Sequence, residues 1–346
     1  MDRSLVAGTL RGKTILVTGG TGSFGHQIVK SLLEYAPASI RVYSRDEKKQ
    51  HDMKQAYAEH ANLRFLLGDV RDYGRTCEVT RGADIVFHAA AMKQVPSSEE
   101  GPWEAVKTNV VGAENVRRAA IENRVATVVA ISTDKAVKPV NVMGMTKSLQ
   151  ERLILGPPAD GAGTTFVCVR YGNVLGSRGS VIPLFKQQVQ AGKPMTITHP
   201  QMTRFLLTLC EAVELVMWAT VKGQNGDLWV RKMPAANVVD LAKTVALGVC
   251  GDEDYPTKII GTRAGEKLHE VLVSEEEMWR ATQLDQHYLI PAWWRSAQQQ
   301  EDVGADLPEY ASDSFPLLAR PQLFDLLRGD GWFDDARRLK AYNAAA

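Results

Sequence analysis

The chain has 346 residues, of which 45% are hydrophobic and 23% are charged, values typical of a soluble globular protein. This length predicts two lobes and a core large enough to need no metal or disulfide. The 41 Lys and Arg residues nearly balance the 40 Asp and Glu residues, which excludes an overall field that would hold nucleic acid or an anionic membrane. Locally placed basic residues must therefore meet any anionic ligand.

The four cysteines lie far apart and form no CxxC or Cys/His cluster, which favours reduced thiols in a cytoplasmic protein. His88 and His269 have no third ligand at metal spacing, so we expect no metal site. The first residues lack the apolar core of a signal peptide, and no apolar run is long enough to cross a bilayer. We expect no membrane insertion and no nucleic-acid partner.

From residue 13 onward, short β-branched runs alternate with longer amphipathic stretches. The pattern predicts a strand at 14–17, a glycine-rich turn, a helix at 24–35, a strand at 40–43 and a polar helix. Further strands are expected at 63–67, 85–88, 128–132 and 166–170, separated by helices. Strand–helix alternation of this kind predicts an α/β fold, a Rossmann-type doubly wound parallel sheet.

After about residue 172 the pattern becomes irregular, with recurrent proline and glycine. We expect a cofactor-binding domain over 11–175, with a return to the sheet at 206–232. A smaller substrate lobe is expected over 176–205 and 233–295. The polar, turn-rich stretch that follows suggests a peripheral C-terminal extension over 296–346.

The turn after the first strand holds Gly19, Gly22 and Gly25 at GxxGxxG spacing. Such a turn lets the backbone approach a pyrophosphate, and the helix that follows directs its N-terminus at the anion. A glycine triplet alone is weak support, but its place after the first strand of a βαβ unit favours a dinucleotide site. The rest of the loop that we assign to this site is Thr21, Ser23 and Phe24.

The residues after the second strand distinguish NADP from NAD. A site for NAD would place an acid there for the ribose 2′-hydroxyl. Here Ser44 and Arg45 occupy that place and Lys48 follows closely, a set that suits a 2′-phosphate. Alternatively, Ser44 and Glu47 form a helix capping box and the lysines are solvated. Both can hold together, and we expect NADP.

Motifs along the first 270 residues resemble those of the extended short-chain dehydrogenase/reductase family. They are TGGTGSFG (18–25), YSRDEKKQ (43–50), GDVRD (68–72), HAAAMKQVP (88–96), KTNVVGAENV (107–116), STDKAVKPVNVMGMTK (132–147), RYGNVLGSRGSVIP (170–183), MTRF (202–205) and GTRAGEKLHE (261–270). Within that family the chain is most similar to the UDP-N-acetylglucosamine 4,6-dehydratases that invert C5. The resemblance implies a homo-oligomer, a dimer or hexamer, that supplies a 4-keto-6-deoxy UDP-sugar for surface glycans.

The resemblance also implies a mechanism. Hydride leaves C4 of the sugar for NADP⁺, the C5 proton and the 6-hydroxyl are eliminated, and hydride returns to C6. Lys135 would be the C5 base and Asp134 the acid at O6, while Thr133 would donate to the 4-oxygen. The alternative for Asp134 and Lys135 is an exposed loop ion pair, which their position after a buried strand disfavours.

The family's catalytic tyrosine is Met143 here, although some dehydratases of this group also carry methionine at that place. A thioether cannot take the proton of the sugar 4-hydroxyl, and Met143 by itself also suits a core position. We therefore hypothesise that Asp134 acts twice, as base toward O4 and then as acid toward O6. Two other interpretations stay open, an inactive NADP-binding regulator and a UDP-sugar 4-epimerase.

The remaining roles come from the resemblance. Lys147 would bind the nicotinamide ribose and Asn109 would organise the active-site helix. The other residues expected at the cofactor are Asp69, Val70, Ala89, Ala90, Ala91 and Tyr171. The residues expected at the UDP-sugar are Lys93, Asn173, Arg178, Val181, Arg204, Arg263 and Glu266. An isolated arginine is more often a surface residue, but arginine forks match a diphosphate well.

Overall fold

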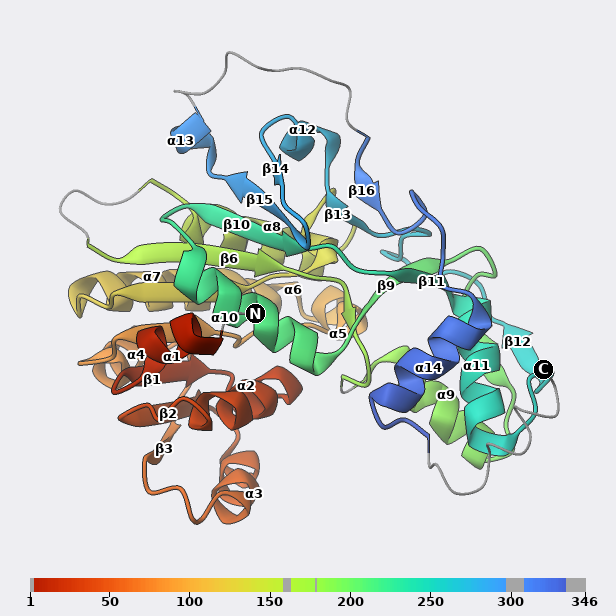
Figure 1. Cartoon of the computed structure of the whole chain (residues 1–346), viewed down its shortest axis with the longest axis horizontal. Coiled ribbons are helices and arrows are strands. Elements are labelled where there is room, and N and C mark those ends of the chain that lie inside the picture. The colour runs from red at the N-terminus through yellow and green to blue at the C-terminus, as the bar shows by residue number, and fades with distance from the viewer. Residues whose placement is uncertain (1–2, 158–162, 178, 297–307, 334–346) are drawn as a thin grey trace. The chain divides into compact units, whose positions relative to one another are not determined.

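The computed structural model describes residues 3–157, 163–177, 179–296 and 308–333 (Figure 1). The chain divides into two compact units. Unit 1 comprises Met1–Tyr171, Leu209–Lys232 and Leu272–Glu309, and unit 2 comprises Gly172–Thr208, Met233–Val271 and Tyr310–Ala346.

The core of unit 1 is a sheet of nine strands in the order β14-β15-β10-β6-β5-β4-β1-β2-β3. Their bounds are β1 (Thr14–Thr18), β2 (Ser39–Ser44), β3 (Leu63–Leu67), β4 (Ile85–His88), β5 (Thr127–Ile131), β6 (Thr165–Arg170), β10 (Asp227–Arg231), β14 (Thr282–Gln283) and β15 (His287–Pro291). The strands from β3 to β10 in this order are parallel, so the predicted Rossmann-type sheet is confirmed. The strand order reverses between β1 and β4, and such a switch point is where doubly wound sheets bind ligands.

The edge of this sheet differs from the expectation. β15 pairs antiparallel with β10, and β14 pairs antiparallel with β15. Residues 272–295, expected in the substrate lobe, therefore belong to unit 1. The physical reason is burial, because Tyr288 and Ile290 alternate with less buried neighbours along β15 and are themselves buried.

Helices cover both faces of the sheet, with α1, α2 and α10 in front in Figure 1 and α4, α7 and α8 behind. Helix α1 was not predicted, yet it buries Val6 and Leu10. The helices of unit 1 are α1 (Arg3–Leu10), α2 (Ser23–Leu33), α3 (Glu47–Ala56), α4 (Tyr73–Thr80), α5 (Val95–Glu100), α6 (Pro102–Ala105), the π-helix η1 (Val106–Val111), α7 (Gly112–Glu122), the 3₁₀ turn η2 (Asp134–Ala136), α8 (Val142–Ile154), α10 (Leu209–Lys222), α12 (Glu275–Met278) and α13 (Trp293–Ser296).

Unit 2 is smaller and has its own hydrophobic core, formed by α9, α11 and α14 around short strands. Its elements are β7 (Asn173–Val174), α9 (Val181–Gln190), β8 (Met195–Ile197), β9 (Thr203–Leu207), β11 (Ala235–Asn237), α11 (Val238–Cys250), β12 (Thr257–Ile259), β16 (Tyr310–Ala311) and α14 (Arg320–Gly329), while β13 (Val271–Val273) crosses from unit 2 into unit 1.

The C-terminal part of the chain is not wholly the peripheral extension that we expected. Leu323, Phe324 and Leu327 of α14 are buried in the core of unit 2, and Phe333 joins them. The apolar face of α14 therefore makes residues 310–333 part of that unit. Residues 297–307 and 334–346 of the expected extension lie outside the described residues.

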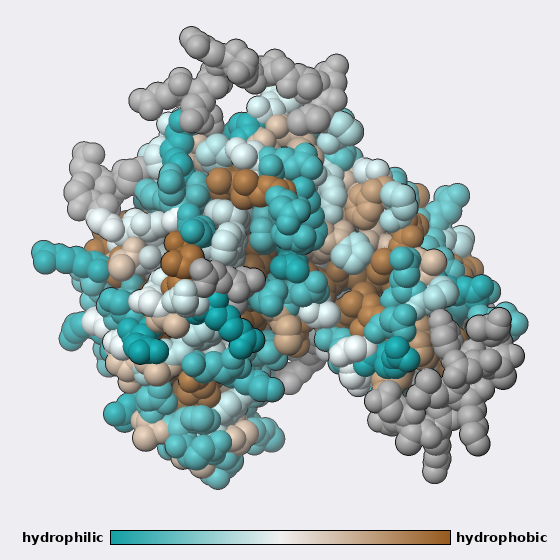
Figure 2. Space-filling model, viewed as in Figure 1, coloured by the Kyte–Doolittle hydropathy of each residue, from teal (hydrophilic) through white to brown (hydrophobic). Residues whose placement is uncertain are grey.

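The surface visible in Figure 2 is mostly hydrophilic, with smaller separate hydrophobic areas. Across the described ranges, no helix combines the length and the apolar character needed to span a bilayer. The four cysteines are unpaired.

Candidate active site

The glycine-rich turn between β1 and α2 forms a backbone cradle. Gly19 has a φ of +67°, and a Cβ there would lie 2.7 Å from the amide nitrogen of Ala90. A Cβ on Gly25 would lie 2.4 Å from the backbone of Gly20. Gly22 begins α2 without a side-chain cap, so the N-terminal amides of the helix face no capping oxygen from that residue. These features fit the pyrophosphate of a dinucleotide.

The ends of β1 and β4 are joined beside this cradle. Thr18 Oγ1 lies 2.8 Å from His88 Nδ1 and accepts the amide N–H of Ala90 at 3.3 Å. Burial lowers the pKa of His88 to about 3, so this imidazole is neutral at physiological pH. Ala89, Ala90 and Ala91 follow directly, and their small side chains leave room at the switch point.

After β2 the structure revises one interpretation. Asp46, and not Ser44, caps α3, because its Oδ1 accepts the N–H of Lys49 at 3.0 Å. Ser44 Oγ instead accepts a hydrogen bond from Gln50 at 3.1 Å. The exposed guanidinium of Arg45 lies 3.6 Å from Asp69 Oδ2.

The other residues expected at this part of the cofactor site are Lys48, Asp69 and Val70, which differ in their exposure and contacts. Lys48 forms an exposed ion pair with Asp52, with 2.7 Å between Nζ and Oδ2. Asp69 accepts hydrogen bonds from Arg71, from Nη2 at 2.7 Å and from Nε at 2.9 Å. Partial burial opposes ionisation of Asp69, but these bonds outweigh it and lower its pKa. Val70 is buried and packs near Gly112.

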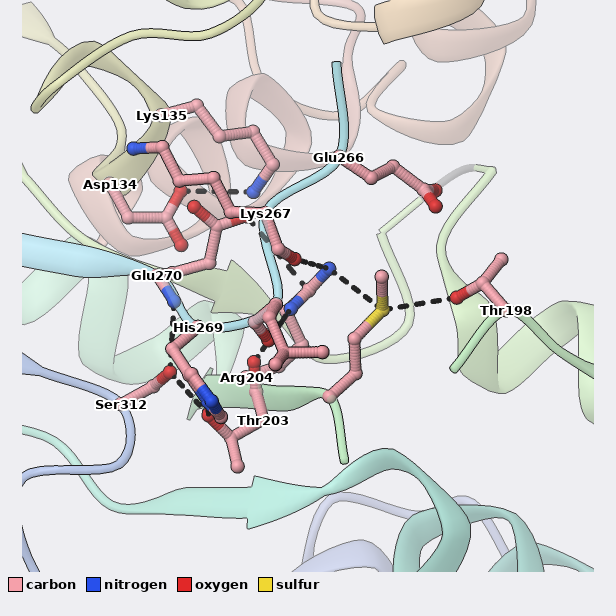
Figure 3. A network of polar contacts seen from close by, with 12 residues as sticks. Asp134, Lys135, Thr198, Thr203, Arg204, Glu266, Lys267, His269, Glu270 and Ser312 are labelled. Carbon is pink, nitrogen blue, oxygen red and sulfur yellow. Dashed lines mark hydrogen bonds and ion pairs between the residues drawn. The ribbon is translucent and has the colours of Figure 1, made fainter. Parts of the chain in front are cut away.

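Thr133, Asp134 and Lys135 lie together at the carboxyl end of β5. Asp134 is fully buried, and its Oδ1 accepts a hydrogen bond from Thr133 Oγ1 at 2.8 Å. The same oxygen accepts a hydrogen bond from Lys135 Nζ at 3.0 Å (Figure 3). Among the described residues, Asp134 Oδ2 has no hydrogen-bond partner. A buried carboxylate oxygen without a hydrogen-bond donor lowers the stability of the fold. Such an oxygen is typical of a functional site, where a ligand supplies the donor.

Backbone contacts hold this turn in place. The N–H of Asp134 donates to the carbonyl of Tyr171 at 3.1 Å. A Cβ on Gly144 would lie 2.2 Å from the carbonyl oxygen of Lys135, so only glycine lets α8 pack this closely against η2.

Met143 is buried in the first turn of α8. Burial raises the pKa of Tyr171, so its phenol stays protonated.

Lys147 is buried in α8 and points back to the sheet. Its Nζ donates to the carbonyl of Ile131 at 2.5 Å and to Gln150 Oε1 at 2.7 Å. Burial lowers the pKa of Lys147 to about 8. Gln150 was missed by the sequence analysis, although a residue three positions after a functional lysine shares its helix face.

Asn109, in η1, ties two segments to each other. Its side chain accepts the N–H of Met92 at 2.8 Å and donates to the Met92 carbonyl at 2.9 Å and to Thr146 Oγ1 at 3.0 Å. The loop after β4 is thereby fixed to α8. Lys93, the residue after Met92, is exposed in this loop.

Of the residues expected at the UDP-sugar, five lie in unit 2, and Arg178 lies outside the described residues. The guanidinium of Arg204 in β9 has hydrogen-bond acceptors within unit 2. It donates to the carbonyl of Thr203 at 2.7 Å and to those of Lys267 and Leu268 at 3.1 Å each (Figure 3). Those bonds tie β9 to the segment at 267–268, so Arg204 has a structural function there.

The other four are more open. Arg263 is exposed, and its backbone N–H donates to Glu266 Oε2 at 3.1 Å. Asn173 forms β7 and Val181 begins α9; both are partly buried. In the parts of both units that the structure describes, no group of three or more His, Cys, Asp or Glu residues is arranged to hold a metal ion.

Comparison with known proteins identifies a matching family and several similar proteins. Residues 15–292 match the family described as "Polysaccharide biosynthesis protein". The protein named UDP-glucose 4-epimerase of Rickettsia conorii is 50% identical over 327 residues, covering 91% of this chain and 95% of its own. The structure of Pen from Bacillus thuringiensis has a TM-score of 0.86 and 35% identity, covering 92% and 99%. DesIV, a dTDP-glucose 4,6-dehydratase from Streptomyces venezuelae with NAD and TYD bound, has a TM-score of 0.67 and 21% identity, covering 74% and 86%.

Proposed function

Because the chain belongs to the polysaccharide biosynthesis protein family, whose sugar-nucleotide dehydratases and epimerases have the extended short-chain dehydrogenase/reductase fold, we propose that it is an NADP-dependent UDP-N-acetylglucosamine 4,6-dehydratase that epimerises C5. One observation carries the proposal. A buried carboxyl group and an amino group, Asp134 and Lys135, lie 3.0 Å apart at the carboxyl end of β5, in the same parallel sheet as the strand that precedes the glycine-rich turn. Elimination of water across C5 and C6 needs such an acid–base pair, whereas a simple C4 epimerisation does not.

The nicotinamide cofactor, which the glycine-rich turn after β1 and Lys147 would hold, would supply a hydride acceptor for C4 and a hydride donor for C6. The chain's own groups move the protons. Asp134 Oδ2, which has no donor among the described residues, takes the proton of the 4-hydroxyl. Lys135 Nζ, whose side chain is 22% exposed, removes the C5 proton, made acidic by the new 4-ketone. Asp134 then gives its proton to the departing 6-hydroxyl. Because C5 is inverted, its new proton must arrive on the face opposite Lys135, and Lys135 releases the proton that it took to solvent.

The preference for NADP over NAD rests on Arg45. Its guanidinium is exposed beside the ribose end of the expected site and lies 3.6 Å from Asp69. A 2′-phosphate would gain a charge-assisted hydrogen bond from Arg45. Lys48 is held by Asp52 and would contribute less.

A UDP-sugar 4-epimerase is the second candidate, and the name of the Rickettsia relative favours it. That reaction transfers hydride from C4 and back to the opposite face of C4, with a group that takes and returns the O4 proton. Met143 cannot take and return this proton. Asp134 would have to do this, and Lys135 would then have no function in the reaction. We therefore rank the dehydratase first.

The test is incubation with UDP-N-acetylglucosamine in deuterated water, followed by NMR of the product. A dehydratase gives a 4-keto-6-deoxy sugar with deuterium at C5 and no net consumption of NADP⁺. An epimerase gives the C4 epimer with hydrogen retained at C5. Failure to convert the sugar nucleotide while NADP⁺ still binds would instead support the regulator.

We also propose that the protein acts as a cytoplasmic homo-oligomer. Large apolar side chains are exposed on the neighbouring helices α6, η1 and α8, namely those of Trp103, Val111, Met145 and Leu149. A patch of this kind on a soluble enzyme is typical of a subunit interface. Sedimentation of the protein and of a Met145→Glu, Leu149→Glu variant tests this, since the variant should lose the oligomer.

A further inference from the structure

Unit 1 contains a cavity of about 370 Å³ that none of the proposed catalytic residues lines. Its walls come from α8, from the turn after η2, from α12 and from the segment joining β15 to α13 (Figure 1). The volume falls in the range of pockets that bind small molecules. Nothing in the proposed dehydratase reaction uses this cavity.

The deepest charged residue of the cavity is Arg170, whose side chain is 2% exposed. All five of its N–H donors are satisfied, two by Glu151, two by Glu277 and one by the carbonyl of Leu272, at 2.6–3.0 Å. Burial disfavours its charge, but the two carboxylates together outweigh burial and raise its pKa. Arg170 is therefore a fixed, saturated part of the wall and has no donor left for a ligand.

Two further guanidinium groups in the lining are not saturated. Arg280 donates from Nε to the carbonyl of Pro291 at 3.1 Å, and within the described ranges its terminal nitrogens have no acceptor. Arg152 has neither an acceptor nor an ion-pair partner among the residues that the structure describes. Burial lowers the pKa of Arg280; the carboxylate of Glu277 opposes this effect, and the charges of Arg152 and Arg170 add to it. Two neighbouring guanidinium groups therefore line the cavity, and both have N–H donors without an acceptor among the described residues.

The other charged groups of the lining are already engaged. Lys138 pairs with Glu309, and Glu276 accepts the hydroxyl of Ser274 at 2.6 Å. The N–H donors of the lining that have no acceptor among the described residues therefore lie on Arg152 and Arg280. Neighbouring arginines with N–H donors left open are typical of sites that take phosphate, since the guanidinium fork matches its oxygens.

An aromatic wall accompanies the two arginines. Trp293 lines the cavity beside Pro291, and 59% of its side chain is exposed. An indole face left uncovered at the rim of a pocket offers stacking area to a planar ring. From these observations we propose that the cavity is a binding site for a small organic phosphate that carries a planar ring, with Arg152 and Arg280 on the phosphate and Trp293 on the ring.

The experiment uses phenyl phosphate as the probe, because it has both features without being a nucleotide. Its binding to the full-length protein is measured by isothermal titration calorimetry, alongside inorganic phosphate and phenol. We expect a Kd of about 1 mM or tighter for phenyl phosphate and much weaker binding of the other two. Arg280→Gln and Arg152→Gln should each weaken binding about tenfold, and Trp293→Ala should reduce it to the level of inorganic phosphate.

Two matched controls locate the site. Arg118→Gln and Trp103→Ala remove an arginine and an exposed tryptophan of unit 1 that do not line the cavity, and they should leave the Kd unchanged. Equal binding to all variants, or binding no tighter than that of inorganic phosphate, would overturn the proposal. The measurement needs no catalysis, so its result is independent of the proposed dehydratase activity.

Discussion

The amide oxygen of Gln150 lies 2.7 Å from Nζ of Lys147, and both side chains are buried in unit 1. Gln150 also donates to the carbonyl of Ile131 at 3.2 Å, the same oxygen that Lys147 contacts. Gln150 thus holds the lysine against the end of β5 and stabilises its charged form. It is a positioning residue for the proposed cofactor site.

Replacing Gln150 by leucine should therefore change how activity depends on pH. Without the amide oxygen the pKa of Lys147 falls further below about 8, and the alkaline limb of the kcat/KM profile moves about one pH unit lower. Gln150→Glu should move that limb upward instead. If the function of Gln150 were only structural, Gln150→Leu would lower activity equally at every pH. Gln188→Leu in unit 2 is the control, and any loss of activity that it causes should be the same at every pH.

Lys147 itself should lower the stability of the protein at neutral pH. Its pKa is about 8 in the folded state and near 10.5 when exposed, so folding penalises the charged form. The penalty is fully present below pH 8 and disappears as pH rises toward 10.5. Lys147→Met should therefore be about 1–2 kcal/mol more stable than the parent at pH 7 by urea unfolding, with a much smaller gain at pH 10. A gain of the same size at pH 10 would exclude titration of Lys147 as its cause.

The dual function of Asp134 predicts a specific intermediate pattern. Asp134→Asn removes the base toward O4, so mixing with UDP-N-acetylglucosamine should give no transient NADPH absorbance. Lys135→Ala should still give that absorbance but should block solvent exchange at C5. Normal NADPH formation in Asp134→Asn would assign the first proton to another group, with Lys135 the next candidate.

Cofactor choice should depend on Arg45 more than on Lys48. Arg45→Asp should weaken NADP binding at least tenfold and improve NAD binding, because a 2′-phosphate loses its guanidinium and meets a carboxylate. Lys48→Ala should change either Kd little, since Lys48 is already paired with Asp52. Equal affinity of the unmodified protein for NAD and NADP, measured by calorimetry, would contradict the assignment.

Close packing at Gly144 should be essential to the catalytic turn. Gly144→Ala places a methyl group 2.2 Å from the Lys135 carbonyl, so α8 or η2 must move, at a cost of about 2–3 kcal/mol. Activity should fall together with stability. Gly8→Ala, in α1 with open space around it, is the matched control and should be neutral or stabilising.

Local patterns in the sequence were sufficient for the parallel sheet. β-branched runs such as 14–17 and 85–88 can only be buried strands, and the glycines at 19, 22 and 25 leave few alternatives to a phosphate-binding turn. Periodicity is a short-range property, so it also predicted helix α2 to within a few residues. The expected position of residues 133–135 after a strand is likewise found, since η2 follows β5, while their proposed functions come from the family resemblance.

Only the tertiary structure decided which surfaces each segment buries. β15 could join the main sheet because β10 offered it an open edge, and α14 belongs to unit 2 because an apolar core meets its buried face. The same holds for single groups. Arg204 looks like a ligand-binding arginine in the sequence, yet its terminal N–H groups donate to carbonyls that include those of the distant residues Lys267 and Leu268. Gln150 and Arg280 likewise gain their significance from neighbours. Hydrogen-bond saturation depends on contacts between residues far apart in the chain, and no local pattern encodes it.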